Sequence, residues 1–192
     1  VHIKRDELGL QFGPNSLAHG HSNGRLEKDS HNVQWDLCWS LAERGFRHFS
    51  QASMYDGDFP KVKLLTPCLN SRFTGSLIVD GERFDIRDAP GMQGHNWGRQ
   101  HAETWVWTHC NTFDVPDVVF EGVTSHLQLG PMLSPSLTLM HFAPDDEPPI
   151  TINSWTDMML SRGQRDALTW RFRGTSNNRA IEGWFKAPAE RF

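Results

Sequence analysis

Polar and apolar residues alternate strictly between Asn32 and Leu41. Five apolar side chains occupy every second position of this run: Val33, Trp35, Leu37, Trp39 and Leu41. Because successive side chains of a β-strand point to opposite faces, this period predicts a strand with one apolar face. Similar short runs recur between turn residues, and no window shows the i, i+3, i+4, i+7 apolar spacing of a helix. The pattern predicts an all-β protein.

A second alternating run follows Thr104. Trp105, Trp107 and His109 stand at odd positions, while Val106 and Thr108 stand between them. A strand here would place the two indoles and the imidazole on one face, at ~6.6–7 Å intervals. We expect this face to look into a ligand cavity, with the even-numbered residues packed against a neighbouring element or solvent.

The clearest hairpin is expected over residues 72–87. Strands at 72–79 and 82–87 flank Asp80-Gly81, a two-residue connection suited to a type I′ turn. The Asp-Ala-Pro-Gly stretch at 88–91 then predicts the end of the strand. We expect residues 91–103 to form a histidine-rich loop that carries His95 and His101 to the start of the next strand.

The composition excludes several classes of function. A net charge of −4 and a pI near 6.2 give no electrostatic reason to expect a nucleic-acid partner. No apolar run approaches the ~20 residues of a membrane helix. Three cysteines without a CxxC pair favour a reducing compartment, and we expect a cytoplasmic location. A chain that begins at Val1 rather than Met indicates a processed or trimmed N-terminus.

The segment from Gly75 to Phe113 resembles tocopherol cyclases. It contains Gly-Glu-Arg-Phe at 81–84, Ala-Pro at 89–90, Asn-Trp-Gly at 96–98 and the Trp-x-Trp-x-x-Cys-Asn-x-Phe pattern at 105–113. Gly94-His95 replaces the Glu-Lys of the cyclase pattern, and His101-Ala102 replaces its Phe-Pro. The wider resemblance is to the lipocalin-like superfamily that also includes carotenoid 1,2-hydratases of the hydroxyneurosporene synthase type, AttH-like proteins and fungal Diels–Alderases.

This resemblance implies a fold and a kind of substrate. The fold would be an all-β, lipocalin-like antiparallel barrel, as part of a two-barrel architecture. Residues 1–130 would form barrel strands with the histidine-rich loop, and residues 131–192 would add strands that start a second barrel. The substrate would be a hydrophobic isoprenoid or polyketide-like molecule in the barrel cavity, and no cofactor would be required.

The candidate catalytic groups are residues that can exchange protons near neutral pH or orient such a residue. They are His95, His101, His109 and Asp88. Aromatic faces stabilise a developing cation, and polar side chains fix a ligand. The candidate substrate-binding residues are Trp97, Trp105, Trp107, Asn96, Asn111 and Trp35. The histidine spacing matches no standard zinc signature, so we predict no metal.

Three functions fit these residues. The first is a cofactor-independent lyase or isomerase that cyclises or hydrates an isoprenoid. The second is a non-catalytic carrier of a hydrophobic small molecule. The third is a structural half-barrel used in assembly. The histidines and tryptophans named above could instead have a structural role only. The histidines would then make hydrogen bonds within loops, and the tryptophans would pack in the core. The sequence leaves the oligomeric state open.

Overall fold

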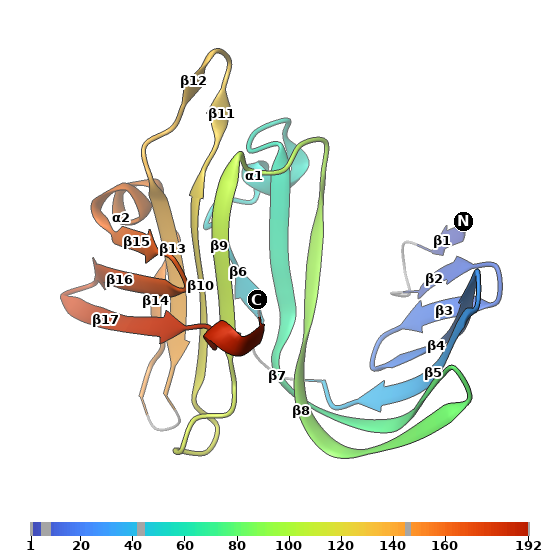
Figure 1. Ribbon diagram of the computed structural model, residues 1–192. Helices are drawn as coiled ribbons and strands as arrows, with labels where there is room; N and C mark the ends of the chain where they lie inside the picture. Colours follow the sequence, from blue (N-terminus) through green and yellow to red (C-terminus); the bar gives the residue numbers. More distant parts are fainter. Residues whose placement is uncertain (1, 5–8, 42–44, 145–146, 192) are drawn as a thin grey trace. The chain divides into compact units, whose positions relative to one another are not determined.

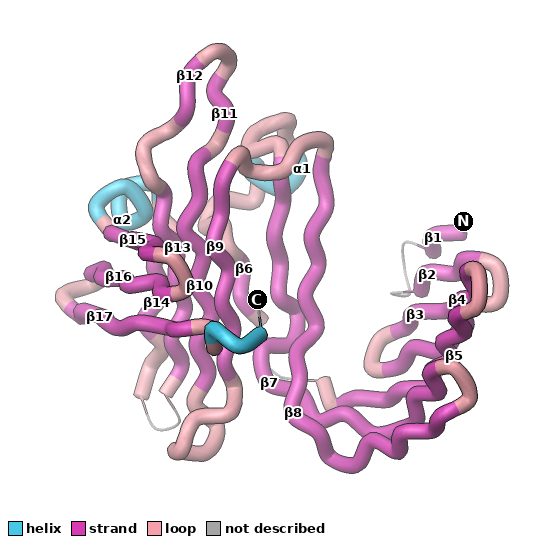
Figure 2. The backbone as a smooth tube through the Cα atoms, in the orientation of Figure 1, coloured by secondary structure: helices cyan, strands magenta, loops and turns pink. Residues whose placement is uncertain are grey.

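The computed structural model describes residues 2–4, 9–41, 45–144 and 147–191. Antiparallel strands dominate these residues, with two short helices and one 3-10 turn (Figures 1 and 2). The prediction of an antiparallel all-β protein is therefore confirmed. The chain separates into two compact units, residues 1–43 with 70–93, and residues 44–69 with 94–192. The predicted division into 1–130 and 131–192 stays a prediction.

The first unit is an antiparallel meander. Its strands are β1 (His2–Lys4), β2 (Gly9–Phe12), β3 (Asn15–Ala18), β4 (His21–Lys28) and β5 (His31–Trp39), completed by parts of β7 (Val62–Val79) and β8 (Glu82–Gly98). The strand predicted from the alternation after Asn32 is confirmed as β5. Asp80 and Gly81 connect β7 to β8 with φ of 50° and 89°. Two positive φ angles are what a type I′ turn requires.

The histidine-rich loop predicted over residues 91–103 is wrong for its first eight residues. β8 continues through the Asp-Ala-Pro-Gly stretch to Gly98, because it remains paired with β7. Asp88 takes a φ of 50°, which lets the backbone kink without leaving the strand. The strand ends at Gly98, where φ is 139° and a Cβ would lie 2.0 Å from the Lys61 carbonyl oxygen. Only glycine fits this close approach.

The second unit is built on a four-stranded sheet in the order β14-β13-β10-β9. These strands are β9 (Thr104–Cys110), β10 (Val119–His126), β13 (Leu137–Ala143) and β14 (Ile150–Ile152). The strand predicted after Thr104 is thus confirmed. The other elements of the unit are β6 (Phe46–Arg47), α1 (Ser53–Asp56), the hairpin of β11 (Gln128–Leu129) and β12 (Met132–Leu133), α2 (Trp155–Leu160), β15 (Arg162–Asp166), β16 (Thr169–Ser176), β17 (Arg179–Lys186) and the 3-10 turn Ala189–Arg191.

Separate apolar clusters cover the two faces of this sheet. Val119, Val123 and Leu139 belong to a cluster completed by side chains near β6, α1, β7 and α2: Phe46, Phe49, Met54, Leu69 and Met158. The alternate residues Phe120, Met140 and Ile152 pack with Trp170 and Phe172 of β16. Residues 119–124 of β10 are consequently all buried. A polar side chain on this strand is removed from water on both sides.

Within the described ranges, the strand pairings leave each sheet open, and we find no closed barrel. The lipocalin-like character of the fold therefore stays a prediction. The helices that the structure describes are too short to cross a membrane.

Candidate functional site

The only acidic side chain of β10, Glu121, lies at the centre of a buried polar cluster. Glu121 is 1% exposed, on the sheet face that Val119 and Val123 share. The register of the sheet aligns His109 of β9, Glu121 of β10, His141 of β13 and Thr151 of β14 in one row across the four strands. Side chains in register on neighbouring strands point to the same face and lie within contact distance.

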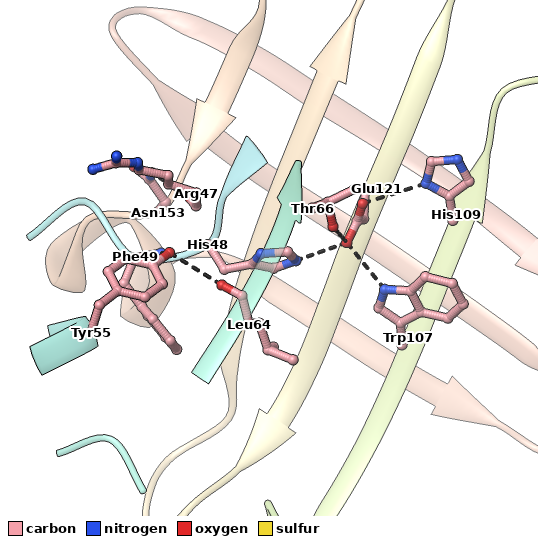
Figure 3. A network of polar contacts seen from close by, with 10 residues as sticks. All are labelled: Arg47, His48, Phe49, Tyr55, Leu64, Thr66, Trp107, His109, Glu121 and Asn153. Carbon is pink, nitrogen blue, oxygen red and sulfur yellow. Dashed lines mark hydrogen bonds and ion pairs between the residues drawn. The ribbon is translucent and has the colours of Figure 1, made fainter. Parts of the chain in front are cut away.

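Three hydrogen-bond donors converge on one carboxylate oxygen (Figure 3). His48 Nε2 donates to Glu121 Oε1 at 2.8 Å, Thr66 Oγ1 at 2.9 Å and Trp107 Nε1 at 3.2 Å. The donors come from different parts of the second unit: Thr66 lies on β7, Trp107 lies on β9, and His48 follows β6. The fold thus assembles the cluster from segments that are far apart in the chain.

The second carboxylate oxygen faces His109. His109 Nδ1 lies 3.4 Å from Glu121 Oε2, an ion-pair distance. The ring is buried beside Trp107, with the ring centroids 6.2 Å apart. Among the described residues, neither Nδ1 nor Nε2 of His109 makes a hydrogen bond, and both atoms are buried. The geometry therefore places one buried nitrogen of His109 at ion-pair distance from a carboxylate, and the other buried nitrogen on the far side of the ring.

The cluster contains opposed pKa shifts. Burial by itself would raise the pKa of Glu121, but the contacts with His109, His48 and Trp107 outweigh it and hold that pKa well below the usual value of 4.5. Burial lowers the pKa of His141 from 6.5 to about 4, against the attraction of the Glu121 carboxylate. At neutral pH the row therefore contains an ionised carboxylate and a neutral His141, whose Nδ1 is 2.9 Å from Thr151 Oγ1.

An ionised carboxylate that accepts this many hydrogen bonds cannot serve as an acid. It can fix the orientation of the imidazole beside it, as the carboxylate does in carboxylate–histidine pairs of hydrolytic enzymes. The group then available for proton exchange is His109, through Nε2. The arrangement suits transfer of a proton at a buried position next to an aromatic surface.

Two of the predicted site residues, Trp107 and His109, meet at Glu121, and they share the predicted face. Trp105 lies two residues before Trp107 on the same face of β9 and is 58% exposed. Trp107 is 44% exposed, although its Nε1 donates a hydrogen bond to Glu121. Val106, on the opposite face, packs against the cluster of Trp170 and Phe172, as expected for the even-numbered residues. The β9 strand therefore presents two partly exposed indoles beside a buried histidine.

His95 and Trp97 belong to a separate aromatic stack. They lie two residues apart on β8, so their rings share a face, with centroids 4.7 Å apart. Trp97 stacks in turn on Tyr55 at 5.9 Å. The Tyr55 hydroxyl accepts from Phe49 N and donates to Leu64 O, and burial raises its pKa. Asn96, between the two stacked residues, is exposed.

The other predicted residues lie in different surroundings. Exposed His101 lines a surface recess with Lys61 and Gln128. Asp88 belongs to the first unit, where its carboxylate is 3.1 Å from the Arg72 guanidinium. Trp35 is also in that unit and donates from Nε1 to Ser22 Oγ.

Asn111 follows directly after β9 and is half-buried. Among the described residues, no group of three or more His, Cys, Asp or Glu side chains is arranged to hold a metal ion.

Sequence reasoning missed His48, Thr66, Glu121 and His141. One signal was available, because Glu121 interrupts the apolar run Val118-Val119-Phe120 and Val123. A charged residue within a strand buried on both faces requires partners. Those partners are 73 and 55 residues away in the chain, at His48 and Thr66, and no local pattern identifies them.

Comparison with known proteins points to one family. A tocopherol cyclase-like family model matches residues 62–145. Two similar proteins are a probable chloroplastic tocopherol cyclase of Oryza sativa subsp. japonica and a chloroplastic tocopherol cyclase of Zea mays. Each is 42% identical over 40 residues, which is 21% of this chain and 8% of the relative. The match thus covers less than a tenth of either relative's length. No solved structure gives a significant match.

The tocopherol cyclase part of the predicted resemblance is therefore supported. The wider resemblance to hydratases and AttH-like proteins stays a prediction. The names of the two relatives place those proteins in the chloroplast, and the cytoplasmic location expected for this chain is not confirmed.

Proposed function

We propose that this chain carries cyclase-type chemistry on a hydrophobic isoprenoid substrate. The observation that supports the proposal is that the family match and the buried cluster share residues. The segment matched by the tocopherol cyclase-like family includes Trp107, His109 and Glu121, three members of the buried cluster. A carrier function is less favoured, because the similar proteins are named as cyclases.

The proposed reaction is an internal addition of a hydroxyl group across a carbon–carbon double bond. The acid gives a proton to one alkene carbon, and the hydroxyl oxygen forms a bond to the other carbon. The hydroxyl proton then returns to the base, so substrate and product are isomers. The reaction is redox-neutral and needs no electron acceptor.

In this proposal His109 exchanges the proton through Nε2. Glu121 is a positioning residue that holds His109 Nδ1 and also receives the hydrogen bonds of His48, Thr66 and Trp107. The indole faces of Trp105 and Trp107 would stabilise cationic character on the alkene, by ~1–2 kcal/mol each when desolvated. A buried site strengthens each of these electrostatic contributions relative to water.

The remaining predicted residues keep their roles as proposals. His95, His101 and Asp88 are further candidates for catalysis, and Trp97, Asn96, Asn111 and Trp35 for substrate binding. We also propose that the sheets belong to a lipocalin-like barrel architecture that surrounds the isoprenoid chain.

The test uses a polyprenyl hydroquinone as substrate. Incubation with the purified chain should yield a chromanol of identical mass, separated by chromatography and identified by mass spectrometry. His109→Gln should lower the rate by at least ~100-fold, the usual contribution of a general acid. His19→Gln is the matched control, because His19 is an exposed turn residue, and it should leave the rate unchanged.

Two outcomes would contradict the proposal. Binding of the hydroquinone without any product would indicate a carrier. A rate equally sensitive to His109→Gln and His19→Gln would exclude His109 as the proton-exchanging group. Far-UV circular dichroism of each variant separates either outcome from loss of the fold.

A further inference from the structure

The β11–β12 hairpin carries exposed apolar side chains. Leu129 is 40% exposed, Met132 68% and Leu133 52%. The hairpin extends beyond the end of the β10–β13 pair, with Gly130 and Pro131 at its tip (Figure 1). Exposed apolar side chains gathered at the tip of a hairpin are a common sign of an interaction surface.

The base of the hairpin is fixed. Ser134 N donates to Leu127 O, and Leu127 N donates to Ser134 Oγ, both at 2.8 Å. Ser134 is buried, so these bonds are protected from water. The apolar tip is therefore held at a defined position instead of folding back onto the sheet.

A polar recess adjoins this base. Its walls include four side chains that can donate hydrogen bonds or carry positive charge, Lys61, Gln100, His101 and Gln128, together with Phe59, Val62 and Leu127. The recess is a shallow, open depression, and none of the seven described residues that line it carries a carboxylate. Lys61 Nζ donates to Gln100 Oε1 at 3.1 Å. The recess therefore suits an anionic group, although the whole chain has a net charge of −4.

We infer that the β11–β12 hairpin and this recess together form a docking surface for a membrane that contains anionic lipids. The exposed Leu129, Met132 and Leu133 enter the acyl layer, while a lipid phosphate contacts the exposed Lys61 at the mouth of the recess. Apolar insertion and attraction of a basic side chain to anionic headgroups act together in peripheral membrane binding.

The size of the surface favours a lipid layer over a second copy of the chain. A stable protein interface buries about 800 Å² on each partner and uses about 20–30 residues on each side. The two strands of this hairpin have two residues each, and three exposed side chains do not approach that size. Binding to a bilayer does not require shape complementarity between two protein surfaces. A small apolar tip next to a cationic side chain is therefore sufficient for membrane binding.

Co-flotation with vesicles tests this inference without any substrate, so its result is independent of the proposed function. The probes are phosphatidylcholine vesicles with and without phosphatidylglycerol. We expect stronger binding to the anionic vesicles and weaker binding at high salt. The double variant Met132→Ser/Leu133→Ser should bind about tenfold less, because its tip no longer removes two apolar side chains from water.

Lys61→Gln should weaken binding to anionic vesicles about fivefold, which corresponds to ~1 kcal/mol for one basic side chain at an anionic surface. The matched controls are Met159→Ser/Leu160→Ser on α2, where both side chains are exposed, and Lys186→Gln on β17. Both controls should bind as the wild type does.

Equal binding to the two kinds of vesicle would overturn the inference, as would an equal loss in the α2 control. Concentration-dependent dimerisation that the hairpin double variant abolishes would also overturn it, and would assign the tip to a second copy. Circular dichroism confirms that each variant retains its strands before binding is compared.

Discussion

Replacing Glu121 by glutamine isolates the charge of the buried cluster. The two side chains have nearly the same size and shape, so the apolar packing around β10 is preserved. The amide oxygen can occupy the position of Oε1, where it still accepts from Thr66 and Trp107. What disappears is the negative charge that faces His48 and His109.

The expected cost follows from the individual contacts. The two retained neutral hydrogen bonds contribute ~1 kcal/mol each and change little. A hydrogen bond to a charged acceptor contributes ~1.5–3 kcal/mol, and the bond from His48 loses this assistance. The new amide N–H₂ group also takes the place of Oε2, 3.4 Å from His109 Nδ1. We expect the free energy of unfolding at neutral pH to fall by about 2–3 kcal/mol, less than the ~3–5 kcal/mol for removing a partner outright.

The loss should depend on pH. The pKa of Glu121 is depressed in the folded protein, so its contribution is fully present above the unfolded value of 4.5 and declines as the pH falls below it. The glutamine variant has no such ionisation. The difference in stability between wild type and Glu121→Gln should therefore narrow steadily below pH 4.5.

Urea unfolding followed by tryptophan fluorescence measures this difference. A lower midpoint at constant slope reports a change in stability rather than in the denatured state. Glu182→Gln is the matched control, since that carboxylate is 72% exposed and 3.6 Å from Arg173, and it should change stability by less than ~0.5 kcal/mol. If Glu121→Gln changes the free energy of unfolding as little as Glu182→Gln does, the Glu121 carboxylate is not paired as described. The same conclusion follows if the stability difference between wild type and Glu121→Gln does not narrow below pH 4.5.

Three further predictions concern this sheet and the residues packed against it. The free energy of unfolding should fall by about 3 kcal/mol between pH 6.5 and pH 4, because the depressed pKa of His141 in the folded protein favours proton uptake by the unfolded chain. The His141→Gln variant, measured by the same urea unfolding, should lack this decline. Gly163→Ala should destabilise the protein by ~1–3 kcal/mol in thermal melts, since its Cβ would lie 1.8 Å from Thr124 Oγ1. Trp107→Phe keeps an aromatic ring but loses the Nε1 hydrogen bond to Glu121, so the free energy of unfolding should drop by ~1 kcal/mol, and the rate of the proposed cyclisation should fall more than the affinity for its substrate.

The sequence predicts a strand or turn correctly where a short segment contains all the residues that determine it. The run after Asn32 became β5, the run after Thr104 became β9, and Asp80-Gly81 formed its tight turn with positive φ at both residues. In each case one short segment contains the whole signal. The common face of Trp107 and His109 follows from the same period-two rule.

Features that depend on partners far away in the chain were not predictable in this way. The turn signal at Asp88-Ala89-Pro90-Gly91 was overridden because β8 stays paired with β7, and pairing depends on a strand that begins 26 residues before Asp88, at Val62. Local sequence does not identify the Glu121 cluster, because its run is apolar and its donors come from β7, β9 and His48 after β6. Local propensity is a weak guide wherever tertiary contacts decide the conformation.

The buried cluster is poorly explained by stability alone. Desolvating a carboxylate and its partners costs about as much as their attraction returns, and apolar replacements of similar volume are often neutral or stabilising. β10 lies between two apolar clusters, so an apolar side chain at position 121 would find ready neighbours in Val119, Val123 and Leu139. A carboxylate there instead lies 3.4 Å from His109 Nδ1, and within the part of the chain that the structure describes His109 Nε2 has no hydrogen-bond partner beside the partly exposed indole of Trp107. An apolar core alone would not require a carboxylate at this position, and its place beside His109 fits the proton exchange that we propose for this histidine.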